Sequence, residues 1–422
     1  MIAAVPLPAH TDVPTLAADA VSRAARAAIA LAGVDETPLL DPVRTAVAYT
    51  SERWVRIAGA TPVAFAPLSG FFATRDGVVR THANYPHHRA ALLRALRLPR
   101  ATDRDGLAHA LASSTSSAAA AAVTDAGGLC VTVRAEDPAR DAALRGTPLV
   151  AIDQVTDGPP VPLPAPTAAA PLSGIRVLDL TRVIAGPVAT RTLALLGADV
   201  LRIDPPLLPE LAHQHLDTGH GKRTAVLDVA TRPGAARFGE LLESADIVAL
   251  GYRGTGLDRL GLSAHRLAAR RSGLIVLSLT AWGVPDRRGF DSLVQAESGI
   301  ALLEGHDGLP GALPAQALDH TAGYLLAAAA MELLQRRARS GGSWHARTSL
   351  RRVAAELLGL PRSAAGAGPD ARDLSVDPTG HTQTFTVDGV EVTTAAPAVR
   401  YPGGPDAFAA PRPWGRDEPA WA

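Results

Sequence analysis

VLDLTRVIAGPVATRTLALLGADVLRID, residues 177–204, has the pattern of a β-strand, a tight turn, a helix and a second strand. In such a unit the free N–H groups at the helix N-terminus can receive a phosphate or a carboxylate. The turn contains one glycine, Gly186, where the GxGxxG fingerprint of dinucleotide-binding proteins has three. NAD or FAD binding of that kind is therefore poorly supported, and a plain structural crossover remains an alternative. Asp204, the carboxylate at the end of the unit, is given no role.

The alternation of strands and helices continues downstream of this unit. Strands are predicted at 175–180, 200–203, 224–227, 247–250 and 274–279, and helices are predicted to begin near Pro187, Pro233 and Ser263. One helix is predicted over 289–305 and a long one over 319–340, followed by Gly341. The fold class is therefore α/β, with a Rossmann-like parallel sheet and a smaller α+β domain.

The regions outside this alternation suggest four segments. Residues 1–155 mix helix and strand, with a helix near 16–32, a strand-turn-strand in FFATRDGVVRTH (71–82) and a helix from His87. Residues 156–171 are rich in proline and alanine and predict a linker. Residues 172–360 form the α/β domain. A polar segment, 361–381, opens the tail 361–422, in which Asp388-Gly389 predicts a hairpin turn.

Composition argues against nucleic acid and membrane partners, because 41 basic residues are balanced by 41 acidic ones. No window approaches the roughly 20 apolar residues of a spanning helix, and the N-terminus lacks the pattern of a signal peptide. We therefore expect a cytoplasmic protein. Cys130, the only cysteine, excludes an intrachain disulfide. His82, His87 and His88 match no familiar ligand spacing, so we predict no metal site and a surface or interface role for them.

Six segments in a fixed order resemble one protein family. The first is PLSGIRVLDLTRVIAGPVATRTLALLGADVLRIDPP (171–206). The others are GKRTAVLDV (221–229), GYRGTGLDRLGLS (251–263), LIVLSLTAWG (274–283), GFDSLVQAESG (289–299) and ALDHTAGYLLAAAAMELLQRRARSG (317–341). Together they resemble the class III coenzyme A transferases, the family of formyl-CoA and carnitine CoA-transferases. The α/β region 172–360 is then expected to be the CoA-binding and catalytic domain.

The resemblance implies a set of CoA contacts. Val183, Ile184 and Ala185 would line the CoA site. Lys222, the only lysine in the chain, and Arg223 would lie near the phosphates, and Tyr252 and Arg259 near the nucleotide. Gly251 stands where the family often has asparagine. Coenzyme A or acyl-CoA would be a substrate, and no tightly bound cofactor is expected.

The catalytic residue implied by the resemblance is Asp319 in LDHTAG. Transfer of CoA between acids by this route needs a carboxylate that attacks a thioester, forms a mixed anhydride and then carries CoA as an enzyme thioester. A helix start favours an ionised aspartate through the dipole and through capping. The same position also suits an aspartate that only caps the helix.

Two other functions remain open. The family includes α-methylacyl-CoA racemases, which carry His before Asp in the motif that here is Gly289-Phe290-Asp291, and Phe290 cannot exchange protons. Asp291 is expected to support structure. A catalytically inactive CoA-binding protein is the other alternative, because segment 71–100 resembles small-domain sequence that ordinarily follows the catalytic region. This order suggests a rearranged chain.

The expected partners are an acyl-CoA, an acceptor carboxylic acid and a second copy of the chain in a homodimer, possibly interlocked.

Overall fold

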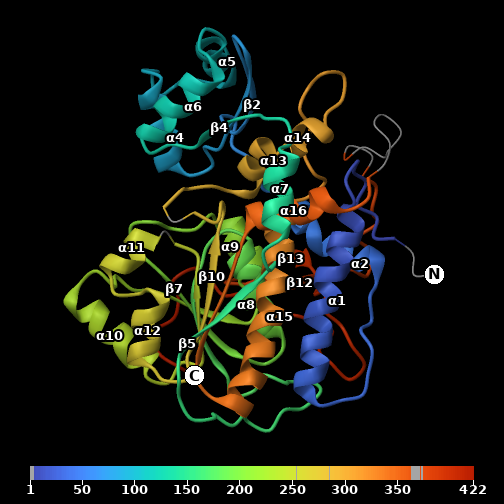
Figure 1. The fold of residues 1–422 in the computed structure, drawn as a ribbon, viewed down its shortest axis with the longest axis vertical. Helices are drawn as coiled ribbons and strands as arrows, with labels where there is room; N and C mark the ends of the chain where they lie inside the picture. Colours follow the sequence, from blue (N-terminus) through green and yellow to red (C-terminus); the bar gives the residue numbers. More distant parts are fainter. Residues whose placement is uncertain (1–3, 253, 285, 363–370, 372–373) are drawn as a thin grey trace.

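The computed structural model describes residues 4–252, 254–284, 286–362, 371 and 374–422. Within these residues the main sheet has seven strands in the order β5-β11-β10-β9-β6-β7-β8 (Figure 1). The strands are β5 (Ala151–Thr156), β6 (Arg176–Leu180), β7 (Asp199–Asp204), β8 (Lys222–Val226), β9 (Ile247–Leu250), β10 (Ile275–Thr280) and β11 (Ser343–Ser349). Neighbouring strands are parallel except for β5, which is antiparallel to β11. The α/β class is confirmed, and β6 to β10 match the five predicted strands within two residues.

Both faces of the main sheet are covered by helices. Because alternate strand residues point to opposite faces, neighbouring residues of one strand belong to different cores. Val177 belongs to the core shared with α1, α8 and α15, whereas Leu178 belongs to the core shared with α10 and α12. Figure 1 shows α1 and α15 side by side, and the two helices contact each other. These helices are α1 (Val13–Ala32), α8 (Ala185–Leu195), α10 (Arg232–Leu242), α12 (Ala264–Arg270) and α15 (Ala317–Ser340).

Shorter helices connect the strands near the carboxyl edge of the sheet. They are α7 (Pro138–Arg145), α9 (Ala212–Thr218), α11 (Gly254–Arg259), α13 (Asp291–Ser298), α14 (Ile300–Leu303) and α16 (Leu350–Gly359). The prediction of a single helix over 289–305 is wrong, because Gly299, with φ 100°, separates α13 from α14. A Cβ atom at Gly299 would lie 2.5 Å from the backbone nitrogen of Glu136, so only glycine fits there.

A smaller unit sits above the main sheet in Figure 1, with its own hydrophobic core around Leu92, Leu107 and Val123. Its sheet has the order β2-β3-β4 and is antiparallel. The unit consists of β2 (Gly70–Thr74), β3 (Gly77–Thr81), α4 (Pro86–Ala95), α5 (Arg104–Ala112), α6 (Ser116–Asp125) and β4 (Cys130–Thr132). It contains the predicted strand-turn-strand, the helix at His87 and the buried Cys130 thiol.

A third sheet joins the N-terminal region to the C-terminal hairpin, where β1 pairs with β13. The elements here are α2 (Pro42–Tyr49), α3 (Ser51–Trp54), β1 (Arg56–Ile57), β12 (Thr382–Val387) and β13 (Val390–Ala395). The hairpin turns at Asp388 and Gly389, as predicted. Much of the polar segment expected at 361–381 lies outside the described residues.

Outside the small unit, the segment predicted over 1–155 packs against the α/β region. α1 packs on α15, β5 extends the main sheet, and one hydrophobic cluster joins Val5 and Val21 to Leu193 and Leu326. Among the described residues, the unit around residues 68–130 has a hydrophobic core of its own, and the boundaries predicted at 156–171 and at 361 stay predictions. Among the described residues, no helix is both long and apolar enough to cross a bilayer.

Candidate active site

A cleft of about 340 Å³ opens where the strand order reverses. From β6 the chain proceeds to β7 and β8 on one side, then returns to β9 beside β6 and continues to β10 and β11. Ligands of open α/β sheets bind at such a reversal, outside the carboxyl ends of the strands. The residues that follow these strands line the cleft: Arg182, Val183 and Ala185 after β6, Gly251 and Tyr252 after β9, Ala281 after β10 and Leu350 after β11.

The turn after β6 is held by the buried carboxylate of Asp179. Oδ1 of Asp179 accepts hydrogen bonds from the backbone N–H of Thr181 (3.0 Å) and from its hydroxyl (2.5 Å), and Oδ2 accepts from the Thr190 hydroxyl (2.6 Å). Lys222 Nζ donates to the same Oδ2 (3.0 Å) and to the carbonyl of Pro187 (2.9 Å). Burial raises the pKa of Asp179, but Lys222, Arg202 and the hydroxyl donors outweigh it, and the net shift is downward. One ionised carboxylate thus ties the strand to the first turn of α8.

Two glycines let the start of α8 pack closely against its neighbours. A Cβ atom on Gly186 would lie 2.3 Å from Cβ of Thr181, and one on Gly323 would lie 2.7 Å from the carbonyl oxygen of Ala185. Both contacts are too short for any real side chain. Gly186 and Gly323 therefore set the distance between the turn after β6, α8 and α15.

Val183 has a left-handed backbone (φ 70°), which is uncommon for a β-branched residue. Its N–H donates to Oε2 of Glu210 at 3.0 Å, and Glu210 also bonds Arg202 (3.1 Å) and the hydroxyl of Tyr85 (2.5 Å). Such strained residues persist where the surroundings over-determine them, often at functional sites. The conformation leaves Val183 facing both the cleft and a second, smaller cavity.

Asp319 lies in the first turn of α15 and is 6% exposed. It forms no side-chain capping bond, so the alternative that Asp319 only caps the helix is not supported. Asp319 lines the cleft of about 340 Å³ and also the second cavity of about 40 Å³. Val183 and Phe290 are shared by the two cavities as well. The Asp319 carboxyl group therefore lies where the two cavities meet.

A second carboxylate, Asp291, contacts the backbone of Asp319. Its Oδ2 accepts the backbone N–H of Asp319 at 2.9 Å, and its Oδ1 accepts from Gln295 Nε2 at 2.6 Å. Burial raises the pKa of Asp291 to about 6. Burial, and then the Asp291 carboxylate, raise the pKa of Asp319 well above its usual range. Desolvation therefore opposes the stabilisation of the ionised form that the helix start was expected to provide for Asp319.

Four of the predicted CoA contacts lie at this site. Val183, Ala185 and Tyr252 line the cleft, and Ile184 lines the smaller cavity. The hydroxyl of Tyr252 is buried and has no hydrogen-bond partner among the described residues. A buried hydroxyl without a partner is costly, so a ligand atom that bonds to it would gain affinity.

The other three predicted contacts do not reach the cleft. Lys222 is 2% exposed and is already paired with Asp179, so the phosphate role predicted for it does not fit its placement. Arg223 donates to Asp199, at the amino end of β7 and thus at the opposite edge of the sheet, and to the carbonyl of Ala420. Arg259, at the end of α11, is exposed and lines neither cavity.

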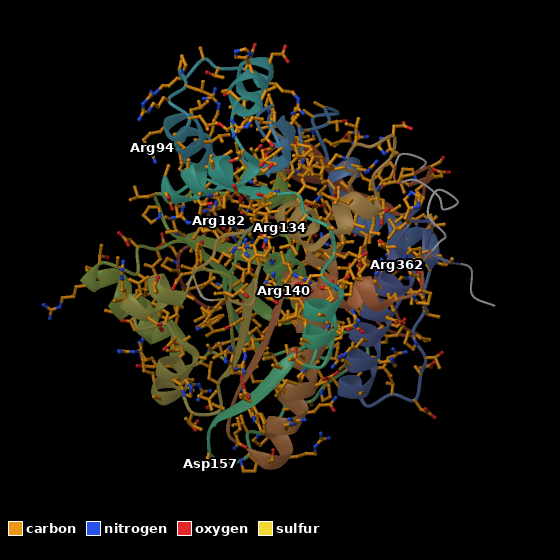
Figure 2. The ribbon with its side chains drawn as sticks, turned by 45° about the horizontal axis from the view of Figure 1, so that its top comes forward. Arg94, Arg134, Arg140, Asp157, Arg182 and Arg362 are labelled. Carbon is orange, nitrogen blue, oxygen red and sulfur yellow. The ribbon has the colours of Figure 1, made fainter. Side chains whose placement is uncertain are left out.

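Other cations line the cleft in their place. Arg182, labelled in Figure 2, lies over the Tyr85 ring at 4.9 Å, between the small unit and the main sheet. Arg287 and Arg288 line the cleft after β10, and the Arg287 guanidinium lies 3.7 Å from the centre of the Trp282 ring and pairs with Glu297. None of these arginines was predicted from the sequence, although the position of Arg287 and Arg288 between a parallel strand and the motif GFD is a signal for those two.

The small unit also contributes its histidines to the site. His87 and His88 line the cleft, and His82 lines the smaller cavity. The His82 ring stacks on Phe290 with centroids 4.1 Å apart. Burial lowers the pKa of His82 and of His88 to about 3, so both rings are neutral at pH 7. The interface role expected for these residues fits this placement, but sequence spacing alone does not predict their proximity to Asp319.

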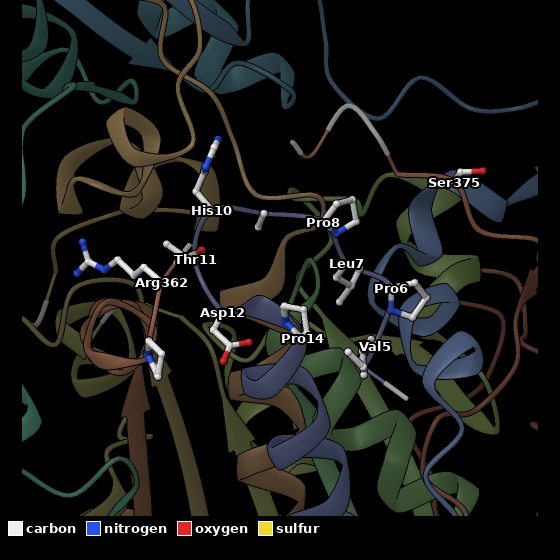
Figure 3. A pocket seen from close by; sticks show the side chains of 13 residues that line it. Val5, Pro6, Leu7, Pro8, His10, Thr11, Asp12, Pro14, Arg362 and Ser375 are labelled. Atoms are coloured by element: carbon white, nitrogen blue, oxygen red, sulfur yellow. The ribbon is translucent and has the colours of Figure 1, made fainter. Parts of the chain in front are cut away.

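A larger hollow of about 600 Å³ lies elsewhere, along residues 4–14 (Figure 3). It is lined by residues 4–12 and Pro14 together with Pro361, Arg362 and Ser375. It includes neither Asp319 nor any residue of the six motifs. We therefore place the candidate site at the cleft, which has the buried titratable groups and the strand ends.

The chain is similar to several known proteins. The chain is 33% identical over 197 residues to a protein named probable fatty acyl-CoA transferase of Mycobacterium tuberculosis, covering 42% of this chain and 50% of that protein. It is 32% identical over 216 residues to a succinate–glutarate CoA-transferase of Agrobacterium fabrum, covering 46% of this chain and 54% of that protein. The chain thus spans about half the length of the curated relatives it matches.

A crystal structure of a hypothetical protein from Mycobacterium tuberculosis aligns with a TM-score of 0.43 and 32% identity, covering 45% of this chain and 56% of that one. The model of the family described as CoA-transferase family III matches residues 172–383. This range begins just before β6 and includes Asp319, the turn after β6 and the arginines after β10. By this match the chain belongs to CoA-transferase family III.

Proposed function

We propose that the protein is an acyl-CoA:carboxylate CoA-transferase with Asp319 as its nucleophile. The observation that carries the proposal is the position of Asp319, which lines both the cleft at the strand reversal and the smaller cavity beside it. A thioester bound across this point would have CoA in the cleft and its acyl group in the smaller cavity. The relatives that the chain matches over about half of their length are named as an acyl-CoA transferase and a CoA-transferase, and these names support CoA transfer as the reaction.

The reaction then proceeds in two halves. The Asp319 carboxylate attacks the thioester carbonyl, and the CoA thiolate leaves, giving a mixed anhydride between Asp319 and the acyl group. The thiolate attacks the Asp319 carbonyl, the first carboxylic acid departs, and CoA remains as an aspartyl thioester. An acceptor carboxylate repeats these steps in reverse, so that its carbonyl ends on CoA and Asp319 is restored.

The residues around Asp319 support these steps in distinct ways. Val183, Ala185 and Tyr252 contact CoA, and Arg182, Arg287 and Arg288 bring positive charge toward its phosphates. Asp291 anchors the backbone of Asp319. Burial raises the pKa of Asp319, and a poorly solvated carboxylate is a strong nucleophile once ionised.

A trapping experiment tests the proposal. The protein is incubated with acyl-CoA and treated with hydroxylamine, which converts an aspartyl thioester to a hydroxamate that peptide mass spectrometry finds at Asp319. Asp319→Asn should bind CoA in calorimetry, form no adduct and lose transfer by at least about 10³-fold. Transfer that survives in Asp319→Asn contradicts the mechanism. CoA binding without any adduct or turnover in the unmodified protein favours the inactive CoA-binding alternative.

One observation also favours a second function, proton transfer at the α-carbon of an acyl-CoA. Phe290 replaces the histidine of the racemases, but His82 from the small unit stacks on Phe290 and lines the same small cavity as Asp319. A neutral imidazole and a carboxyl group on one cavity form an acid/base pair. Solvent deuterium should then enter the α-carbon without any acceptor acid, and His82→Phe should abolish the exchange. Absence of exchange in the unmodified protein removes this function.

The resemblance further predicts a homodimer. Light scattering on the purified protein measures this directly, and a monomeric mass contradicts it.

A further inference from the structure

The smaller cavity beside Asp319 contains polar atoms that lack partners. His82 is 5% exposed and Asp217 6% exposed, and both line the cavity together with Glu52. Among the described residues, Nδ1 of His82, Oδ1 of Asp217 and Oε2 of Glu52 are buried and have no hydrogen-bond partner. The Oδ1 atom of Asp217 lies 3.9 Å from Arg191 Nη1, beyond hydrogen-bonding distance. Orphan polar atoms of this kind call for a ligand or water, because leaving them unpaired is costly.

The charge of this cavity distinguishes it from the cleft. The described residues that line it include no lysine or arginine. Burial lowers the pKa of His82 to about 3 and also lowers that of His213, so both imidazoles are neutral at pH 7. Burial raises the pKa of Glu52 to about 7 and also raises that of Asp217. The cavity is therefore neutral to negative and rich in hydrogen-bond acceptors.

These properties restrict the acyl group that fits. A second carboxylate, as in a dicarboxylic acid, would meet Glu52 and Asp217 with no lining cation to neutralise it. A plain alkyl end would leave the three orphan atoms unpaired. A volume of about 40 Å³ has room for roughly three water-sized groups, which excludes long chains.

We propose that this cavity binds the distal end of a short acyl group that carries a hydrogen-bond donor, either a hydroxyl or an ammonium group, and that Glu52 determines this specificity. The proposal rests on the CoA-transferase function, since it assigns the acyl side of the same site. Glu52 comes from α3, outside the segment matched by the family model, so the specificity would reside in the N-terminal part of this chain.

A matched set of acyl-CoAs tests the proposal. 3-Hydroxypropionyl-CoA, β-alanyl-CoA, butyryl-CoA and succinyl-CoA share a three-carbon chain and end in hydroxyl, ammonium, methyl and carboxylate. Their affinities are measured by calorimetry on Asp319→Asn, which needs no turnover, and their kcat/KM values on the active protein. We expect a donor-ended acyl group to be preferred over butyryl-CoA and succinyl-CoA by about 10-fold or more.

Variants of Glu52 identify the source of the preference. Glu52→Leu should reduce the ratio of donor-ended to butyryl substrate to about 1. Glu52→Gln should keep a preference for hydroxyl and lose one for ammonium, because the amide accepts a hydrogen bond but carries no charge. Glu240→Gln, on the exposed side of α10, is the control and should leave every ratio unchanged.

The outcomes separate the two proposals. Preference for succinyl-CoA or butyryl-CoA, or ratios that Glu52→Leu leaves unchanged, overturns the specificity proposal while adduct formation at Asp319 still supports transfer. Failure of all four substrates to form an adduct, with selective binding intact, overturns the transfer function and leaves the assignment of the cavity supported.

Discussion

The backbone N–H of Asp319 donates a 2.9 Å hydrogen bond to Oδ2 of Asp291, so one carboxylate anchors the helix turn that carries the other. The anchor is itself fixed, because Gln295 Nε2 donates to Oδ1 of Asp291 and Gln295 Oε1 accepts the N–H of Leu313. Asp291 is fully buried. It is therefore a positioning residue, and its charge also raises the pKa of Asp319.

The pH dependence of the unmodified protein should reflect this arrangement. Protonated Asp319 cannot attack a thioester, so the rate of adduct formation should fall as pH falls through the raised pKa of Asp319. Since an ordinary aspartate titrates near about 3.9, the acid limb should lie clearly above that pH. Rapid-quench mass spectrometry of the Asp319 peptide at a series of pH values measures the limb. A rate that stays constant down to pH 4 contradicts the expected shift.

Asp291→Asn should move this acid limb to lower pH. Removal of a neighbouring negative charge favours the ionised form of Asp319 and lowers its pKa. The amide nitrogen of the asparagine must face either Gln295 Nε2 or the backbone N–H of Asp319, and both are donors, so we expect a loss of stability of about 1–3 kcal/mol. The pH profile separates the two effects, since a purely structural role of Asp291 would lower the rate at all pH values without moving the limb.

The sequence predicted five strands of the main sheet, and the helix that carries Asp319, because those signals are local. β6 to β10 have continuous apolar runs with turn residues between them, and Asp319 stands at the start of a helix within an ordered set of motifs. The phosphate contact predicted for Lys222 does not agree with its placement, because its partner, Asp179, lies 43 residues earlier in the chain. No pattern around Lys222 indicates whether its side chain faces solvent or a buried carboxylate.

The small unit illustrates the same limit over a longer distance. His82 and Phe290 are about 200 residues apart in the chain, yet their rings stack at the site. Glu52 is farther still from Asp319. Local periodicity predicted the strand before His82 and the helix after it. It did not predict that His82 contacts Phe290, because that contact depends on how the small unit packs over the carboxyl edge of the sheet.

Lys222→Met tests the structural role of the buried ion pair. Loss of the ammonium leaves the Asp179 carboxylate buried without its cation, and we expect the free energy of unfolding to fall by about 3–5 kcal/mol. Glu240→Gln removes the charge of the exposed pair with Arg237 and should change stability by less than about 1 kcal/mol. Denaturant unfolding of both variants is the measurement. Equal free energies of unfolding for the two variants would contradict a structural role of Lys222. They would favour the contact between Lys222 and the CoA phosphates that the sequence predicted.

Arg287→Gln tests the cations that line the cleft. If Arg287 faces the CoA phosphates, the variant should bind CoA about 10-fold more weakly, and its affinity should depend less steeply on salt. Arg259→Gln tests the alternative from sequence, and we expect little change because that side chain is exposed and outside the cleft. Calorimetry at two salt concentrations measures both. A loss confined to Arg259→Gln would favour the sequence-based assignment.

Gly186→Ala tests the close packing that shapes the turn after β6. The new Cβ atom would lie 2.3 Å from Cβ of Thr181, so the turn and α8 must separate. We expect a loss of stability of about 1–3 kcal/mol and weaker CoA binding, because Val183 and Ala185 move with the turn. Gly256→Ala is the matched control, since a Cβ atom there meets nothing within 4 Å and alanine favours the helix. It should be neutral or slightly stabilising. If Gly186→Ala matched this control in melting temperature and CoA affinity, the turn would tolerate a wider spacing, and the position of Ala185 would not depend on a glycine at 186.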